Sequence, residues 1–344
     1  MPRPMARGKC RWDIGGIREM RVIDGATVRS LLSPQDLVQA MGQALADFST
    51  GRVQQHPRVT VESTTSPGRV LIMPSASADA GMGLKVLSMF DRSVERGLPH
   101  VQGVLILLDP TYGEPLAVID GVALTEIRTA AVTARATELL ARPDAARLAI
   151  IGAGVQGRAH LTALAGLRDW SRITVFSRTA ERAEQLVGWA RLRDLPAELS
   201  DDPDASVKDA DVICTTTSSA SPVVADGSIA PEGVHINGVG AFGATCRELP
   251  TALVRRAEVF VDSREAALRE AGDLLVPIAE GALDASHIRA ELGEVVAGRH
   301  PGRTDVGATT LFKSLGLAVE DLVAARLVYE RAAERDAGVV VGAS

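Results

Sequence analysis

The chain has 344 residues, of which 46% are hydrophobic and 23% are charged, and its formal net charge at pH 7 is −6. This length exceeds a typical single hydrophobic core and predicts two domains, while the mild negative charge without clustered Lys and Arg argues against a nucleic-acid-binding protein. The apolar runs are too short to span a bilayer. The three Cys residues are scattered and form no CxxC pair, so they indicate neither a metal site nor a disulfide framework. This use of Cys favours a reducing, cytoplasmic compartment.

The amino-terminal part of the chain predicts a helix followed by a series of strands. Residues 1–20 are basic and lack the apolar segment of a secretory signal, so we expect an N-terminal extension. Residues 33–51 combine a Ser33 N-cap, Pro34 at the first helical position and apolar residues at helical spacing, which predicts an amphipathic helix. Short apolar runs separated by turn residues follow over 57–63, 69–75, 83–90 and 103–109. Strands in succession, without alternating helices, predict an α+β domain.

The first of these runs alternates, with valines at every second position. We therefore expect Val59 and Val61 to face the core, with Arg58 on the opposite face, which is either solvent or a pocket. A long helix crowded with Ala and Thr follows over 121–141, and its small side chains permit the close approach of neighbouring backbone.

The pattern changes at Leu148, where strands begin to alternate with helices. Apolar strands are predicted over 148–152, 173–177, 211–217, 234–240 and 258–263, with a helix over 181–192 between the second and third. This alternation predicts an α/β fold with a Rossmann-type, doubly wound parallel sheet. The chain ends in a long helix that we expect to return to the first domain. The predicted domains are therefore 21–140 with 310–344, and 141–309.

A glycine-rich turn lies between the first strand of this second domain and the helix that follows. Gly152, Gly154 and Gly157 form G-x-G-x-x-G. The first glycine permits the tight turn, the second leaves room for a pyrophosphate, and the third lets the helix pack close to the strand. The N–H groups at the start of the helix then face the phosphates. The pattern predicts a dinucleotide site; the alternative is a tight turn with a structural role only.

The end of the next strand bears on which nucleotide binds. NAD sites place Asp or Glu about 20 residues after the glycines, on the ribose hydroxyls. Here the corresponding residues are Ser177, Arg178 and Thr179. No carboxylate repels a 2′-phosphate and a guanidinium is present, so NADP(H) is favoured and NAD(H) stays possible. The alternative is that Arg178 decorates the start of a helix.

Three cations in the first domain stand in unusual places. Besides Arg58, Lys85 lies inside an apolar strand, where an ammonium is costly without a purpose or a path to water. Arg128 lies in the small-residue helix. Together these residues would form a carboxylate-binding cluster, because Arg binds a carboxylate bidentately and a partly buried Lys exchanges protons near neutral pH.

The order of several motifs resembles the ornithine cyclodeaminase/mu-crystallin family. These are "PRVTV", "GLKVLS", "LTEIRTAAVTA", "IIGAGVQGRAHL", "INGVG", "CREL", "VDSREAALREAGDL" and "TLFKSLGLAVEDLVAA", spread over residues 20–331. The resemblance implies a homodimer in which an α+β domain binds substrate and forms the dimer, beside a Rossmann domain. Members include cyclodeaminases, an alanine dehydrogenase and ketimine reductases.

The resemblance also implies roles for individual residues. Arg58, Lys85 and Arg128 would contact the carboxylate and amine of an amino-acid-like substrate, with Lys85 and Arg128 catalytic, while Phe242 and Leu315 would also line the substrate site. The nucleotide contacts would be Thr129, Val155, Gln156, Ser177, Thr216, the backbone from Asn237 to Val239, and Ser314. His100 stands where the family often has a Thr that contacts the nucleotide.

One departure from the family bears on the chemistry. Cyclodeaminases carry a catalytic Asp after the V-G pair, and here that position is Phe242, while the position of a following Lys is Cys246. Phenylalanine cannot take up a proton, which argues against ornithine cyclisation. The resemblance then implies an NAD(P)H-dependent reductase of imines of α-keto acids, or the reverse amino-acid dehydrogenase. The alternatives are an ornithine or lysine cyclodeaminase that recruits another base, and a nucleotide-dependent protein that only binds a small ligand.

Overall fold

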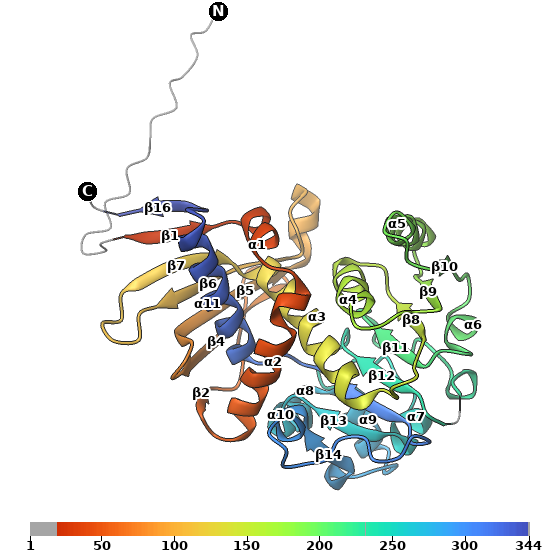
Figure 1. Cartoon of the computed structure of the whole chain (residues 1–344). Helices are drawn as coiled ribbons and strands as arrows, with labels where there is room; N and C mark the ends of the chain where they lie inside the picture. Colours follow the sequence, from red (N-terminus) through yellow and green to blue (C-terminus); the bar gives the residue numbers. More distant parts are fainter. Residues whose placement is uncertain (1–18, 231, 343–344) are drawn as a thin grey trace, which may run out of the picture.

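The computed structural model describes residues 19–230 and 232–342. It contains two sheets of eight strands each, joined by a long central helix (Figure 1). Residues 1–18 of the predicted extension lie outside the described residues, and Met20 already begins the first strand. Within the described residues, no helix combines the length and the apolarity needed to cross a membrane.

The first sheet is built from the amino-terminal strands and the last strand of the chain. Its strands are β1 (Met20–Ile23), β2 (Val53–Gln55), β3 (Val59–Glu62), β4 (Gly68–Ser77), β5 (Gly81–Phe90), β6 (Val101–Leu108), β7 (Pro115–Asp120) and β16 (Val339–Val341). They lie in the order β16-β1-β7-β6-β5-β4-β2, with β3 also paired to β4. The helices of this half are α1 (Gly25–Leu31), α2 (Pro34–Ser49), α3 (Gly121–Leu140) and α11 (Ala318–Glu334), with a 3-10 turn η1 (Asp91–Arg96).

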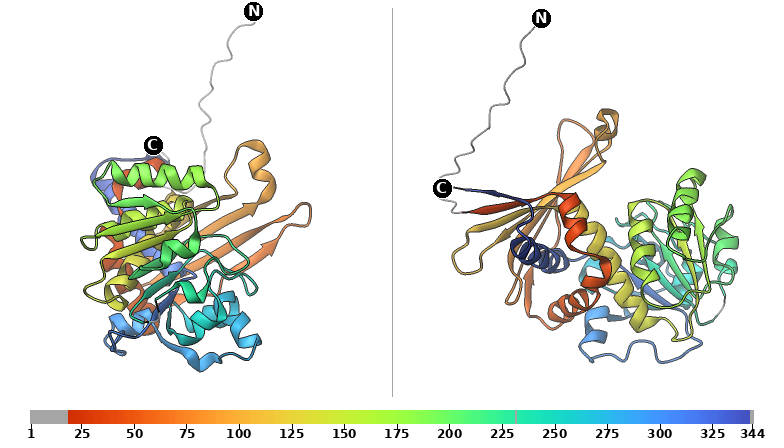
Figure 2. Two further views of the ribbon diagram at one scale, coloured as in Figure 1. Left: turned by 90° about the vertical axis from the view of Figure 1, so that its right-hand side faces the viewer. Right: turned by 45° about the horizontal axis from the view of Figure 1, so that its top comes forward.

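Helices cover one face of this sheet. The predicted helix over 33–51 is α2, and Ser33 and Asp36 form a reciprocal capping box at its start. Helix α11 packs against α2, α3, β4, β5 and β6, so the end of the chain returns to the first sheet. Figure 2 shows α2, α3 and α11 gathered on the same side of the strands. The other face carries no helix of the described chain.

The expected orientation of Val59 and Val61 is wrong. Both are about half exposed, with 48% and 52% of their surface accessible. They pair with Ile72 and Val70 of β4 and so lie on the uncovered face of the sheet, while Arg58 projects toward the helical face. Alternation identifies which residues share a face, but the covered face depends on helices that come later in the chain.

The second sheet is parallel throughout. Its strands are β8 (Arg147–Ile151), β9 (Arg172–Phe176), β10 (Ala197–Leu199), β11 (Val212–Thr215), β12 (His235–Gly238), β13 (Glu258–Val261), β14 (Ile288–Glu291) and β15 (Thr310–Lys313), in the order β10-β9-β8-β11-β12-β15-β13-β14. Its helices are α4 (Val155–Ala165), α5 (Ala180–Arg191), α6 (Pro203–Val207), α7 (Thr251–Arg256), α8 (Arg264–Glu270), α9 (Gly272–Ala279) and α10 (Leu292–Val296), with η2 (Asp226–Ser228) and η3 (Ala285–His287). The predicted fold class, a doubly wound parallel sheet beside an α+β half, is confirmed.

The strand order locates the crevice of the second sheet. Strand β8 pairs with β9 on one side and with β11 on the other, so the chain winds away from β8 in two directions. Ligands of such sheets bind at this switch point, beyond the carboxyl ends of the strands. One predicted boundary shifts, because residues 310–313 pair with β12 and β13 and the chain leaves the second sheet only after Lys313.

Candidate active site

A cavity of about 890 Å³ lies at this switch point. Strands β4 and β5 and helix α3 line it from the first half, and the carboxyl ends of β8 and β9 line it from the second. Most residues singled out in the sequence lie on its wall, namely Arg58, Lys85, Arg128, Thr129, Gly152, Gly154, Val155, Gln156, Ser177, Arg178, Thr179, Thr216, Val239, Phe242, Ser314 and Leu315. The fold thus brings the cations of the first half and the glycine turn of the second to one space.

The glycine turn has the geometry that its sequence predicts. Gly152 has a φ of +108°, which side-chain-bearing residues rarely adopt. A Cβ at Gly157 would stand 1.9 Å from the carbonyl oxygen of Gly152, so the helix packs this close only with glycine there. A Cβ at Gly154 would meet no atom within 4 Å. The start of α4 also has no side-chain cap, which leaves its first N–H groups available to a phosphate.

Two predicted nucleotide residues do not line the cavity. Gly157 lies behind the turn and acts through the close packing just described. Asn237 is fully buried in β12, where its side chain donates to Thr137 and its oxygen lies 3.2 Å from Nε2 of His235. The side chain of Asn237 therefore joins the sheet to α3, and only the chain beyond it, at Val239 and Gly240, reaches the cavity.

The end of β9 presents basic and hydroxyl groups. Ser177, Arg178 and Thr179 all line the cavity, and Arg182 of α5 lies beside them. The hydroxyl of Ser177 accepts a hydrogen bond from the Thr179 amide at 3.3 Å, which shapes the turn. Among the residues described at this strand end, none that faces the cavity is acidic.

Lys85 is the most deeply buried of the three predicted cations. Its exposed fraction is 1%, and its Nζ lies 2.5 Å from Oδ2 of Asp321 and 3.2 Å from the Thr125 hydroxyl. Burial lowers the pKa of Lys85 to about 8, although the Asp321 carboxylate raises it. The residue can therefore hold or release a proton near neutral pH.

Arg128 is held by two buried carboxylates. Its Nε donates to Asp321 at 2.9 Å and its Nη1 donates to Glu320 at 2.6 Å. Within the described chain its Nη2 makes no hydrogen bond, although Arg128 lines the cavity. Burial raises the pKa of Glu320 to about 7 despite the neighbouring guanidinium. The cluster thus fixes the guanidinium from one side.

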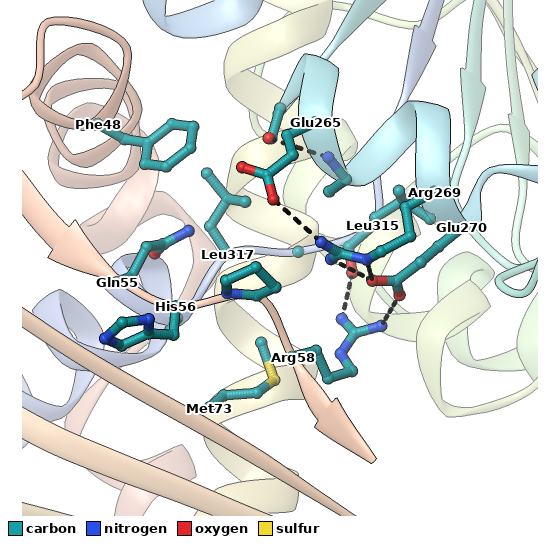
Figure 3. A pocket seen from close by; sticks show the side chains of 15 residues that line it. Phe48, Gln55, His56, Arg58, Met73, Glu265, Arg269, Glu270, Leu315 and Leu317 are labelled. Atoms are coloured by element: carbon teal, nitrogen blue, oxygen red, sulfur yellow. Dashed lines mark hydrogen bonds and ion pairs between the residues drawn. The ribbon is translucent and has the colours of Figure 1, made fainter.

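Arg58 links the two halves of the molecule at the edge of the cavity. Its Nη1 donates to Glu270 of α8 at 2.8 Å and its Nη2 donates to the Leu315 carbonyl at 3.0 Å. Figure 3 shows Glu270 between Arg58 and Arg269 in a small adjoining pocket. The Nε of Arg58 is buried without a partner among the described residues.

The resemblance to the family places Phe242 at the position of the cyclodeaminase carboxylate. The residue is 37% exposed, with the guanidinium carbons of Arg58 and Arg69 at 6.0 and 5.8 Å from the centre of its ring. The loop that carries it is braced by Glu248, whose carboxylate accepts hydrogen bonds from the amides of Thr217, Gly240 and Ala241. The wall of the cavity is therefore apolar at this position.

The segment before α11 closes the cavity. Ser314 and Leu315 lie on its wall. Asp262, fully buried after β13, accepts hydrogen bonds from the Leu315 and Gly316 amides at 2.5 and 2.6 Å. One carboxylate of the second half thus fixes the turn that leads back to the first half.

Two histidines of this region, His100 and His160, differ in their surroundings. His100 lines the cavity but is exposed and lies 3.4 Å from Asp91. His160 is buried in α4, where it contacts the Thr133 hydroxyl and the Gln156 carbonyl, and burial lowers its pKa to about 4. His160 is therefore a packed, neutral residue.

Sequence reasoning did not single out the acidic partners of the cations. Glu320 and Asp321 are fully buried in the first turn of α11. The signal was available, because two adjacent acids inside the apolar stretch 315–325 require buried counter-charges. Two basic residues at the site were not predicted either, Arg69 beside Phe242 and Arg182 on the cavity wall. Neither stands out among the many scattered Arg residues of the sequence.

Known proteins are similar in sequence to this chain over nearly its whole length. The profile of the ornithine cyclodeaminase/mu-crystallin family matches residues 18–336. A Delta(1)-pyrroline-2-carboxylate reductase of Bacillus cereus is 37% identical over 322 residues, which cover 93% of this chain and 98% of the relative. The ketimine reductase mu-crystallin of Mus musculus is 39% identical over 304 residues, which cover 87% and 93%.

A solved structure agrees with the sequence relatives. The Delta(1)-pyrroline-2-carboxylate reductase of Thermococcus litoralis, in complex with NADH and L-proline, has a TM-score of 0.89 to this chain at 34% identity. The match covers 93% of this chain and 99% of that protein. The chain belongs to the ornithine cyclodeaminase/mu-crystallin family.

Proposed function

We propose that this protein is an NAD(P)H-dependent reductase that converts cyclic imines of α-keto acids into amino acids. The observation that carries the proposal is the cluster of Arg58, Lys85 and Arg128 in the same cavity as the glycine turn. Phe242 also lines this cavity, and by resemblance to the family it takes the place of the cyclodeaminase carboxylate. The reductase names of the two relatives, and the NADH and L-proline of the Thermococcus protein, support it.

The residues of the glycine turn fit a dinucleotide. The open space at Gly154 and the uncapped start of α4 suit a pyrophosphate, and Thr216 lines the cavity beside them. When bound, the reduced nicotinamide supplies a hydride to the α-carbon of the imine. The protein then has to supply a carboxylate anchor and one proton.

Arg58 and Arg128 suit the anchor. Both line the cavity, and the protein fixes each guanidinium, Arg58 through Glu270 and the Leu315 carbonyl and Arg128 through Glu320 and Asp321. The Nη2 of Arg128 has no hydrogen-bond partner in the described chain. A guanidinium held in this way loses little conformational freedom when a carboxylate binds. The anchor would orient the α-carbon of the substrate.

Lys85 suits the proton donor. With a pKa of about 8, its ammonium is largely present at neutral pH and loses its proton readily. Donation from Nζ to the imine nitrogen makes the carbon more electrophilic, and addition of the hydride then completes the amine. The neutral lysine regains a proton from solvent after product release.

The remaining wall suits an apolar ring. Leu71, Met73, Leu87 and Met89 project from β4 and β5 into the cavity, and Phe242 faces them from the second half. Apolar walls exclude water around the reacting carbon and give no partner to a second charge on the substrate. We infer a small cyclic ketimine without a charged substituent on its ring.

We propose NADP(H) as the preferred nucleotide, because Arg178 and Arg182 line the cavity at the end of β9. Arg178→Ala is expected to raise the Kd for NADPH about 10-fold, since a charge-assisted hydrogen bond to the 2′-phosphate is lost. The Kd for NADH should stay nearly constant. Fluorescence titration of both nucleotides measures this, with Arg193→Ala, on a guanidinium stacked over Trp189, as the control. An equal loss for both nucleotides would contradict the preference.

We propose that the uncovered face of the first sheet forms a homodimer. This face carries Val59, Ile72, Val86 and Val104 in one paired row, an apolar surface with no helix of the described chain over it. Val104→Lys is expected to convert the dimer to monomer, as light scattering after gel filtration would measure. Val306→Lys, on an exposed valine of the second half, is the control. A wild-type monomer would exclude the interface.

The reaction is tested by following NADPH and NADH oxidation against cyclic ketimines and against α-keto acids with ammonia. The same plates carry an ammonia-release assay on ornithine and lysine. Nucleotide oxidation with cyclic ketimines, without ammonia release, is the expected result. Ammonia release without net oxidation would identify a cyclodeaminase, and ligand binding without turnover would identify a binding protein.

A further inference from the structure

Asp321 joins the two central cations of the site. Its Oδ2 lies 2.5 Å from Nζ of Lys85, and its Oδ1 accepts from Nε of Arg128 at 2.9 Å. All three side chains are buried, with exposed fractions of at most 4%. One carboxylate thus bridges the ammonium and the guanidinium without itself lining the cavity.

The position of Asp321 in the fold favours its negative charge. It lies in the first turn of α11, where the helix dipole stabilises an anion. The two cations lower its pKa in spite of complete burial. The carboxylate of Asp321 in turn favours the ammonium form of Lys85, which lies beside it.

The charges around Lys85 make this carboxylate decisive. Burial lowers the pKa of the lysine, and Arg128 of α3 and Arg58 before β3 lower it further. Glu320 pairs with Arg128, and Asp262 accepts hydrogen bonds from backbone amides. Among the described residues, Asp321 is the one carboxylate at ion-pair distance from Nζ.

We propose that Asp321 is the positioning residue that keeps Lys85 charged and directed at the substrate nitrogen. The proposal rests on the proposed function, because it assigns the proton donor of that reaction to the Lys85 ammonium. Asp321 acts through Lys85, and it touches neither substrate nor nucleotide. The same carboxylate fixes the relative position of proton donor and carboxylate anchor through its second oxygen.

The pH profile separates this role from a purely structural one. Reduction needs the Lys85 ammonium, so kcat falls as pH rises through the pKa of that group. In Asp321→Asn the favourable charge is lost, and the falling limb is expected to move to lower pH by about 1 unit or more. Oxidation of the product amino acid needs the neutral amine, so its rising limb should move in the same direction. A structural defect lowers both rates at every pH and moves neither limb.

Two variants of the same helix complete the test. Glu320→Gln removes the neighbouring buried carboxylate, which touches Arg128 but not Lys85, and is expected to raise KM while leaving the limb in place. Asp321→Glu retains the charge, so its limb is expected near that of the wild type even where its kcat is lower. If Asp321→Asn does not fold, Asp321→Ser takes its place, and the falling limb is expected to move to lower pH in the same way.

The outcomes distinguish a failure of the proposed function from a failure of the role of Asp321. A wild type that reduces no cyclic ketimine contradicts the proposed function. If the wild type is active but the limbs of the charge-removing variants stay at the pH of the wild-type limb, the role of Asp321 is overturned. A limb displaced equally in Glu320→Gln also overturns it, because the effect would then belong to the whole acidic pair.

Discussion

Replacing Lys85 with methionine is expected to lower kcat for imine reduction by about 10²- to 10⁴-fold, the usual contribution of a positioned general acid. Methionine has nearly the same length and fits a buried strand, but it has no proton to donate. The Kd for NADPH should stay within about twofold, because a proton donor contributes to the reaction step and not to nucleotide binding. Stopped-flow reduction and fluorescence titration measure the two quantities.

Lys208→Met is the matched control for this variant. Lys208 is exposed at the end of α6 and is not on the cavity wall, so its loss should leave kcat unchanged. Unchanged activity in Lys85→Met would remove Lys85 from the reaction. A matching loss of nucleotide affinity would indicate that the substitution disturbs the fold of the site.

Replacing Arg128 with methionine is expected to destabilise the protein by about 3–5 kcal/mol, as is usual when one partner of a buried ion pair is removed. The change leaves Glu320 without its cation and takes one of two cations from Asp321. Burial holds the pKa of Glu320 near 7, well above its unfolded value, so protonation of Glu320 at low pH removes part of the cost of its unpaired charge. The decrease in the free energy of unfolding, measured in urea, should therefore be greater at pH 8 than at pH 5.

The control for this prediction lies on the surface of α11. Arg326 pairs with Glu330 one helical turn away and is about one-third exposed. Arg326→Met should change the free energy of unfolding by less than about 1 kcal/mol. Equal losses in the two variants, or an Arg128→Met loss that is independent of pH, would contradict the account of the buried cluster.

Local features of the sequence predicted local structure well. The Ser33 N-cap of α2 and the turn of Gly152 depend on residues close together in the chain, so spacing and residue type were sufficient. The alternation of strands and helices after Leu148 predicted the parallel sheet in the same way. The predicted class of enzyme, an NAD(P)-dependent oxidoreductase acting on carbon–nitrogen bonds, is confirmed by the two reductase relatives.

Features that depend on distant parts of the chain could not be predicted from the pattern alone. The face on which Val59 and Val61 lie depends on α11, more than 250 residues away, which covers the opposite side of the sheet. The environment of Lys85 depends on Asp321 for the same reason. Asn237 shows a related limit, because its strand position was correct but the direction of its side chain toward α3 was not visible in the sequence.

In the proposed reaction a hydride passes to the α-carbon of a cyclic imino acid and stays there. NADPH carrying deuterium at C4, prepared separately with the label on each face of the ring, tests this directly when a cyclic ketimine is reduced and the product is examined by mass spectrometry and NMR. One deuterium is expected at the α-carbon of the product amino acid, from one of the two labelled forms. Product without deuterium, or a label that returns to the nucleotide while ammonia is released, would contradict it.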